Sequence, residues 1–502
     1  MITFCISVIL LLLGYLLYSK LIERLIGVDS ARVTPAVAHP DGVDYVPMKP
    51  WRIFLIQFLN IAGVGPIIGA VMGAQFGTAS FLWIVFGCIL AGAVHDFIAG
   101  FISIRMDGAS LPEIHGRYLG NGMKQFMRAF TVILMILVGA VFVNTPATLL
   151  SQDIFVPEGL RHLDSSVIQY FWVILIFIYY LLATMLPIDK IIGKIYPVFG
   201  ILLLAMALAL VVAFVVYQVP LREVWEGLDN SYPQHETNPI FPMMFISIAC
   251  GAISGFHATQ SPLMARCMVN EKQARPIFYG AMIAEGVVAL IWAAAAAYFF
   301  HDHPELCAGK SGAAMVGVIA NKWFPPAIAF ITILGVVSAA ITSGDTALRS
   351  ARLIVADFMH IDQRPVLKRL WVALPVFVIA AALLVFSLAN PTGFDYIWRY
   401  FSWANQVLAM VTLWAITVFL KQLRRGGWYF ITLIPALFMT MVTVSFLFVA
   451  QKEGLGSLLP HTVGYTIAAV ITAAMGVLFY VRCGKRQCAD ADTGMSEKQK
   501  NQ

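Results

Sequence analysis

Ionisable side chains inside long apolar segments are the residues of this chain best placed to do chemistry. Asp96 follows His95 in one such segment, and Glu285 lies in the middle of another. A charged group at the centre of a bilayer costs about 2.5–3.5 kcal/mol on insertion scales, so such residues are by default candidates for ion or proton pathways. Asp96 and Glu285 therefore fit a buried proton relay, and a structural pairing across helices fits them equally well.

A second group combines hydroxyls with a carboxylate. Thr342, Ser343, Asp345 and Thr346 fall within about one and a half helical turns. Hydroxyl, carboxylate and carbonyl oxygens are hard ligands suited to Na⁺. A simpler explanation is an i,i+4 ion pair between Asp345 and Arg349 that holds a helix end near the membrane boundary.

Two membrane-length segments are interrupted by glycine near their middles. The first interruption reads NIAGVGP (60–66) and the second CGAISGFHATQSP (250–262). The backbone groups freed at such breaks are tolerated only where they face protein or a water-filled cavity. A pair of breaks in corresponding positions of two halves indicates the binding site of a secondary transporter. A close-packed face of small residues is the alternative.

Polar side chains gather at both breaks, including Gln57, Asn60, His257 and Gln260. The second half-helices, beginning near Pro66 and Phe256, direct positive dipole ends toward the middle of the membrane, where they suit a substrate carboxylate. His257 fits a role in substrate binding or proton transfer, and it fits a structural histidine bonded to a carbonyl as well.

The composition indicates that the helices carrying these residues lie in a membrane. The chain of 502 residues is 60% hydrophobic and 12% charged, with mean hydropathy +0.81, which excludes a soluble enzyme. The apolar runs predict an all-α polytopic membrane protein with about thirteen spans. These are 2–18, 51–77, 80–104, 129–150, 167–187, 192–217, 241–265, 276–300, 326–348, 370–389, 395–419, 428–450 and 461–481.

Charge in the loops predicts the orientation. When the connections are assigned alternately to two sides, one side holds only six of the 33 Lys and Arg residues, namely Arg161, Arg222, Lys310, Lys322, Arg399 and Lys452. The positive-inside rule places the other side in the cytoplasm. The N-terminus is then outside and the C-terminus inside, and residues 2–18 are expected to be a retained first helix.

Other site types have little support. The seven cysteines form no CxxC pair, and His301, His303 and Cys307 give only a weak metal signal. No cofactor or nucleic-acid partner is expected, and the absence of HExxH and GxSxG motifs argues against an enzyme. A passive channel and a non-transporting nutrient sensor are the remaining alternative functions.

We also expect a short interfacial helix at 312–323 and a disordered tail at 483–502.

Several long strings resemble the carbon starvation protein A family. They are RVTPAVAHPDGVDYVPMKPW, NIAGVGPIIGAVMGAQFG, GAVHDFIAGFISIRMDGASLPEI, SGFHATQSPLMARC and ITSGDTALRSAR. The resemblance implies a multi-pass bacterial inner-membrane transporter of the amino acid–polyamine–organocation type, with a LeuT-like core of two inverted five-helix repeats and two discontinuous helices. It implies repeats at 51–217 and 241–420, preceded by a helix and loop at 1–50 and followed by two accessory helices at 428–481.

The resemblance also implies roles. The family is associated with peptide uptake during carbon starvation and with pyruvate–proton symport, so a small peptide or carboxylate is expected to be imported by alternating access with protons or sodium. The implied substrate site comprises Asn60, Gly63, Val64, Gly65, Pro66, Gly251, Ser254, Gly255, Phe256, His257 and Gln260. The implied ion site comprises Thr342, Ser343 and Thr346, facing the carbonyls near Asn60–Val64, with Asp345 beside them. Asp96 and Glu285 join them as coupling candidates because of their ionisable side chains inside apolar spans.

Overall fold

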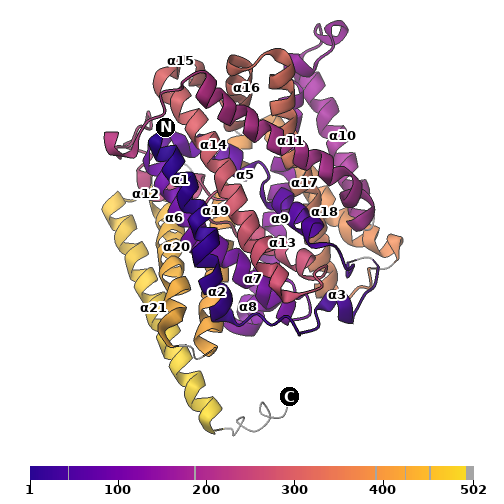
Figure 1. The fold of residues 1–502 in the computed structure, drawn as a ribbon, viewed down its shortest axis with the longest axis vertical. Coiled ribbons are helices and arrows are strands. Elements are labelled where there is room, and N and C mark those ends of the chain that lie inside the picture. Colours follow the sequence, from indigo (N-terminus) through magenta and orange to yellow (C-terminus); the bar gives the residue numbers. More distant parts are fainter. Residues whose placement is uncertain are drawn as a thin grey trace.

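The chain folds into a bundle of helices (Figure 1). The computed structural model describes residues 1–42, 44–185, 188–363, 365–390, 393–423, 426–451 and 454–492. No strand occurs among these residues, which confirms the predicted all-α class.

The membrane-length elements follow the predicted segments closely. They are α1 (Ile2–Leu13) continuing through α2 (Ser19–Ile26), α4 (Pro50–Ile61), α5 (Gly65–Gly73), α6 (Ala79–Gly87) continuing into α7 (Ala93–Arg105), α9 (Asn121–Leu150), α10 (Ser165–Met185), α11 (Ile188–Val216), α12 (Ile240–Ser247), α13 (Gly255–Ala265), α14 (Gly280–Asp302), α17 (Pro326–Met359), α18 (Val366–Ala389), α19 (Gly393–Gln422), α20 (Phe430–Val449) and α21 (His461–Asp492).

Within the described residues, eleven helices are long and apolar enough to cross a membrane, and the bent pair α4–α5 makes a twelfth. The remaining predicted span, 241–265, corresponds to α12 and α13. Its two halves are only 8 and 11 residues long and are separated by a non-helical stretch. Both spans that the glycine pattern predicts to be broken are therefore broken.

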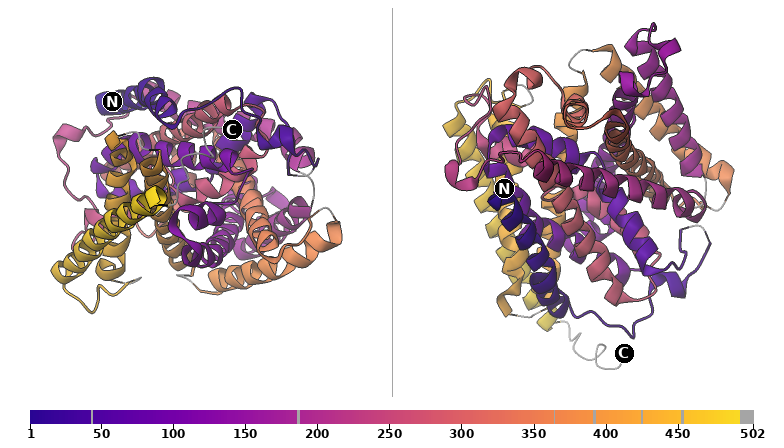
Figure 2. Two further views of the ribbon diagram at one scale, coloured as in Figure 1. Left: turned by 90° about the horizontal axis from the view of Figure 1, so that it is seen from below. Right: turned by 45° about the horizontal axis from the view of Figure 1, so that its top comes forward.

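Burial separates central from peripheral helices. In the most apolar windows of Ala79–Arg105 and Glu271–Asp302, 83% and 78% of residues are buried inside the protein, against 17% for His461–Arg482. Accordingly, α21 runs along the outside of the bundle in both orientations drawn in Figure 2. The two central segments contain Asp96 and Glu285, so the fold shields both carboxylates from lipid.

Two boundaries differ from the predictions. Helix α17 continues to Met359, so Asp345 is an interior residue of the helix and is fully buried, not close to a boundary. The polar sequence after residue 348 contains no helix breaker, and residues 349–354 are all buried inside the protein. Helix α21 likewise continues to Asp492, so residues 483–492 are helical where disorder was expected.

Short elements cap the two ends of the bundle. Helix α16 (Gly312–Trp323) matches the predicted interfacial helix. It lies near α15 (Pro304–Cys307) at one end, whereas α8 (Leu111–Leu119) lies at the other (Figure 1). Met1 is near the α15 end, and α21 terminates beyond the α8 end.

Candidate functional site

The first break exposes two backbone carbonyls that α17 then satisfies. Helix α4 ends at Ile61 and α5 begins at Gly65, with a bend of 43° between them. The Thr342 hydroxyl donates to Leu59 O at 3.0 Å, and the Ser343 hydroxyl donates to Asn60 O at 2.8 Å. Both hydroxyls therefore lie where the sequence predicted, and they bond the carbonyls directly.

The other two residues of the predicted ion group point elsewhere. The Thr346 hydroxyl donates to Thr342 O of its own helix at 3.1 Å. Asp345 lies 3.9 Å from the guanidinium of Arg349, as the i,i+4 interpretation predicts. That guanidinium also donates to Ala183 O of α10 at 2.6 Å. Asp345 therefore takes part in a buried contact between α17 and α10.

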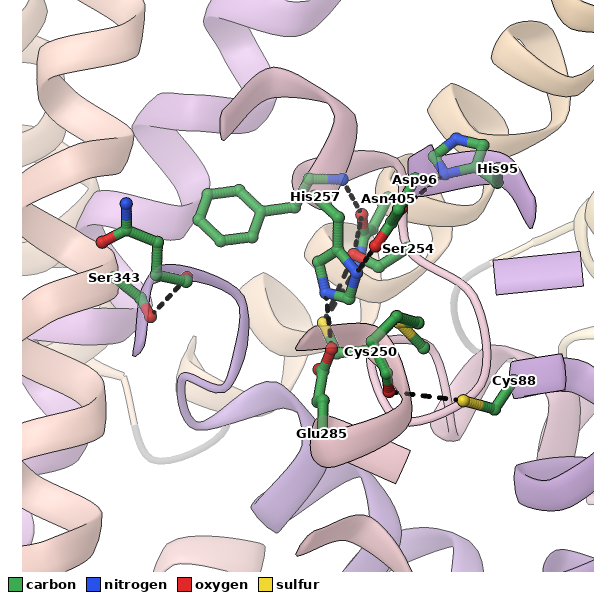
Figure 3. A network of polar contacts seen from close by, with 12 residues as sticks. Cys88, His95, Asp96, Cys250, Ser254, His257, Glu285, Ser343 and Asn405 are labelled. Carbon is green, nitrogen blue, oxygen red and sulfur yellow. Dashed lines mark hydrogen bonds and ion pairs between the residues drawn. The ribbon is translucent and has the colours of Figure 1, made fainter. Parts of the chain in front are cut away.

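The second break is fixed by an asparagine from α19. Asn405 Oδ1 accepts the Phe256 N–H at 2.7 Å and the Ser254 hydroxyl at 3.0 Å (Figure 3). The carboxamide therefore satisfies a free donor at the positive end of α13, where the sequence predicted a substrate carboxylate.

A chain of four ionisable side chains begins beside this break. His257 lies between Asp96 of α7 and Glu285 of α14 (Figure 3). Its Nδ1 is 3.0 Å from Asp96 Oδ2, and its Nε2 is 3.3 Å from Glu285 Oε2. His95 Nδ1 lies 2.8 Å from the other Asp96 oxygen. All four side chains are fully buried. The fold thus brings the predicted residues Asp96, His257 and Glu285 together.

The geometry of His257 favours a proton in this cluster, because Nδ1 is within hydrogen-bonding distance of Asp96 and Nε2 is at ion-pair distance from Glu285, although Nε2 and the Glu285 oxygens have no hydrogen-bond partner among the described residues. Both ring nitrogens face carboxylate oxygens, and a neutral imidazole donates from only one nitrogen. Contact with both carboxylates is favourable when the ring is an imidazolium or when one carboxyl group is protonated. No Lys or Arg in the described chain pairs with Asp96 or Glu285. Unneutralised charge would be costly in this interior, so the cluster is suited to binding and releasing protons.

Glycines let the two broken helices touch. A Cβ on Gly65 would lie 2.3 Å from Cys250 Sγ, and a Cβ on Gly69 would lie 2.8 Å from Ser247 O. Gly73 continues this face of α5, where a Cβ would meet Ile248. The small-residue interpretation therefore holds for this face, and the breaks meet in a closely packed seam.

The predicted substrate residues are closed off from solvent. The segments 60–66 and 251–260 are buried throughout. A small hollow opens beside α8, with a lining that includes Ser110, Thr259, Arg266 and Asp357. Its volume of about 20 Å³ is enough for one water molecule. Thr259 lies next to Gln260, so this hollow approaches the second break from one end of the bundle.

The loop with His301, His303 and Cys307 is not joined by a further metal ligand among the described residues. His303 Nε2 lies 3.1 Å from the hydroxyl of Tyr298, and Cys307 Sγ donates to His303 O. Across the described residues, no group of three or more His, Cys, Asp or Glu is arranged to hold a metal ion.

The sequence matches a known protein family over most of its length. The sequence profile described as carbon starvation protein CstA matches residues 1–159, 162–322 and 304–446. The chain belongs to the carbon starvation protein CstA family. Its relatives include a peptide transporter CstA from Escherichia coli, 26% identical over 88% of this chain and 79% of the relative. They also include the pyruvate/proton symporter BtsT from the same organism, 30% identical over 57% of this chain and 47% of the symporter.

A third relative of this CstA-family chain, an uncharacterized membrane protein of Haemophilus influenzae, is 42% identical over 60% of this chain and 92% of its own length. Solved structures with a similar fold include MhsT bound to L-phenylalanine, with TM-score 0.57, 14% identity and coverage of 80% of this chain and 99% of MhsT. A manganese transporter from Eremococcus coleocola has TM-score 0.54, 12% identity and coverage of 89% and 99%.

These comparisons show a LeuT-like multi-pass protein of the bacterial inner membrane whose relatives include named transporters. Two residues of the site are indicated only weakly by the sequence. His95 is the neighbour of Asp96, and Asn405 is a polar residue inside the apolar span 395–419. The signal in both cases was a polar side chain at mid-span, but sequence alone does not indicate which helix it faces.

Proposed function

We propose that this protein is a secondary active transporter that imports small peptides by alternating access and couples uptake to the inward flow of protons. The observation that carries the proposal is the buried contact of His257 with Asp96 and Glu285 directly beside the second break. Because a proton makes the close approach of His257 to both carboxylates favourable, the protonation state of the cluster is linked to the position of α13.

The link between proton and helix is mechanical. Asp96 and Glu285 belong to α7 and α14, so a protonated His257 holds three helices together. Loss of the proton removes one donor and weakens one of the two contacts. In the transport cycle, protonation from outside would favour the closed cluster, and deprotonation inside would release α13 and the substrate.

The contacts at the first break favour protons over sodium. The carbonyls of Leu59 and Asn60 accept hydrogen bonds from Thr342 and Ser343. A sodium ion at this position would have to displace both bonds. Peptide is favoured as substrate by the relatives described as peptide transporters, which align over most of the chain.

Reconstitution into liposomes tests the proposal. With an inward proton gradient, labelled L-alanyl-L-alanine should accumulate above its outside concentration, and a protonophore should abolish accumulation. Protein-free liposomes and a gradient of reversed sign are the controls. If uptake of dialanine never exceeds equilibration, active peptide transport is wrong. If it exceeds equilibration but persists with the protonophore, another ion drives it.

Pyruvate–proton symport is the second candidate. It is supported by the similarity to the pyruvate/proton symporter BtsT, because proton symport needs a group that binds protons. The same liposomes supplied with labelled pyruvate on the outside separate the two candidates. Accumulation of pyruvate without accumulation of dialanine would replace the peptide by a small carboxylate.

A further inference from the structure

Three buried carboxamides lie close to the two breaks and keep unused hydrogen-bonding atoms. Within the described chain, neither Oε1 nor Nε2 of Gln57 has a partner. Asn60 Oδ1 accepts from the Tyr196 hydroxyl, but Asn60 Nδ2 has no partner. Gln260 Nε2 donates to Thr259, but Gln260 Oε1 has none. All three carboxamide residues have 0% exposure, a situation in which unpaired polar atoms are normally avoided.

The helices place the three residues at similar depth. Gln57 and Asn60 lie in the last turns of α4, just before the first break, and Gln260 lies in the second turn of α13, just after the second break. Helices α4 and α13 pack against one another. The carboxamides therefore belong to a similar layer of the bundle, within about one and a half turns of the breaks.

Gln57 is directed away from the outer helices. Leu55 and Leu59 of α4 approach Gly200 of α11. At 100° per residue, Gln57 is about 200° around the helix from both leucines, so it faces the interior side. On α13, His257 faces Asp96 and Glu285, and Thr259 lies against Met135 of α9. Gln260 follows Thr259 by about 100° around the helix, so it lies between the direction of Thr259 and the direction of His257.

The unused atoms define a chemical preference. Gln57 Nε2 and Asn60 Nδ2 are donors, while Gln57 Oε1 and Gln260 Oε1 are acceptors. A peptide group presents one acceptor C=O and one donor N–H, which a carboxamide can pair with on both sides. Pyruvate presents acceptors only and would leave both glutamine oxygens without a donor.

We propose that Gln57, Asn60 and Gln260 form an amide-recognition site that binds the peptide group of a small peptide substrate. The inference rests on the proposed transport function for its biological meaning, but the recognition itself is a binding property. The site explains how the protein would select a peptide over a simple carboxylate, because rejection of a ligand that lacks a required donor is strong at a buried polar site.

Equilibrium binding tests the site without transport. The full chain in detergent is titrated calorimetrically with L-alanyl-L-alanine and with its ester analogue L-alanyl-L-lactate, which lacks the peptide N–H. We expect dialanine to bind at least about tenfold more tightly than the ester. Gln57→Leu and Gln260→Leu should each weaken dialanine binding and reduce this ratio toward unity.

Matched controls separate recognition from folding. Gln152, just beyond α9, also has a partnerless Oε1 among the described residues but lies away from the breaks, so Gln152→Leu should keep the wild-type ratio. Gln57→Glu, which keeps the shape and an acceptor but loses the donor, is used if Gln57→Leu does not give a monodisperse protein.

Three outcomes would overturn the site: equal wild-type affinity for peptide and ester, an unchanged ratio in both glutamine variants, or binding of pyruvate without dialanine. Tight and selective dialanine binding with no uptake in liposomes would instead support the site and contradict the proposed transport function.

Discussion

His257 Nδ1 lies 3.0 Å from Asp96 Oδ2, although the two residues are 161 positions apart in the chain. The contact joins α7 to α13 and, through Glu285, to α14. It connects α13, which begins at the second break, with two of the most buried helices of the bundle. A proton at one ring can therefore influence the packing of three helices.

His257→Gln removes the group that contacts both carboxylates. We expect the variant to lose proton-driven accumulation, so that the inside concentration of dialanine only equals the outside concentration. Exchange of labelled for unlabelled substrate should continue, because exchange needs no net proton movement. Uptake and counterflow in the same liposomes measure both. His303→Gln, at the far end of α14, is the control and should accumulate substrate normally; full accumulation by His257→Gln would rule out its coupling role.

Replacement of sodium by choline should leave the uptake rate unchanged. The hydroxyls of Thr342 and Ser343 already satisfy the carbonyls that a sodium ion would need. For the same reason, Ser343→Ala should lower stability by about 1 kcal/mol through the lost hydrogen bond, without creating a sodium dependence. A saturable increase of uptake with sodium concentration would show that the ion competes successfully with these bonds.

Gly65→Ala should destabilise the protein by about 1–3 kcal/mol, because the added methyl group would overlap Cys250 Sγ. Thermal unfolding in detergent measures the effect. Gly122→Ala adds the same methyl group where no atom lies within 4 Å, and it should cause no loss. Equal melting temperatures for the two variants would mean that the seam between the breaks is looser than the structure indicates.

Asn405→Ala would leave the Phe256 N–H and the Ser254 hydroxyl without their acceptor. Two buried unpaired donors cost about 2–4 kcal/mol, so the melting temperature should fall substantially. Asn390→Ala removes an exposed asparagine whose Nδ2 donates to Phe386 O in the preceding turn, and it should be nearly neutral. A neutral Asn405→Ala would imply that α13 begins equally well without the carboxamide.

The ion pairs of Glu113 with Lys124 and Arg128 should make the contact between α8 and α9 sensitive to acid. Burial alone would raise its pKa, but hydrogen bonds from Lys124 and Arg128 outweigh burial and hold the pKa below the usual 4.5. The ionised carboxylate therefore stabilises the fold above pH 4.5, and this contribution disappears as the pH falls through the lowered pKa.

Because the Glu113 side chain is 30% exposed, Glu113→Gln should cost only about 0.5–1 kcal/mol near neutral pH. The cost should vanish in acid, where the wild type has lost the same charge. Melting curves of both proteins across the pH range measure the difference, and a difference independent of pH would assign the effect to packing.

Much of the fold could be predicted because hydropathy alone determines which segments lie in the membrane. Both breaks were located within a few residues, since glycine and proline have local backbone consequences. The length of α17 was not predicted: its polar continuation after residue 348 is buried by other parts of the protein, which hydropathy does not register.

The site was predictable as a set of residues but not as a set of contacts. Asp96, His257 and Glu285 were each notable as polar groups in apolar spans, yet their mutual distances depend on how three helices rotate about their axes. The hydroxyls of Thr342 and Ser343 were placed correctly against the first break. Asp345 belongs to the same short sequence but contacts Arg349, because successive residues on a helix point in different directions.

The Asn405 carboxamide acts as an internal competitor at the start of α13. Any external carboxylate that binds there must first exchange with Asn405 Oδ1, so its affinity is reduced by the free energy of that exchange. When the ligand dissociates, Asn405 Oδ1 is still close by and accepts again the hydrogen bonds that the ligand had accepted. Weak binding and rapid release of a carboxylate at this position would then have a common origin. Both properties suit a protein that has to release its ligand in every cycle.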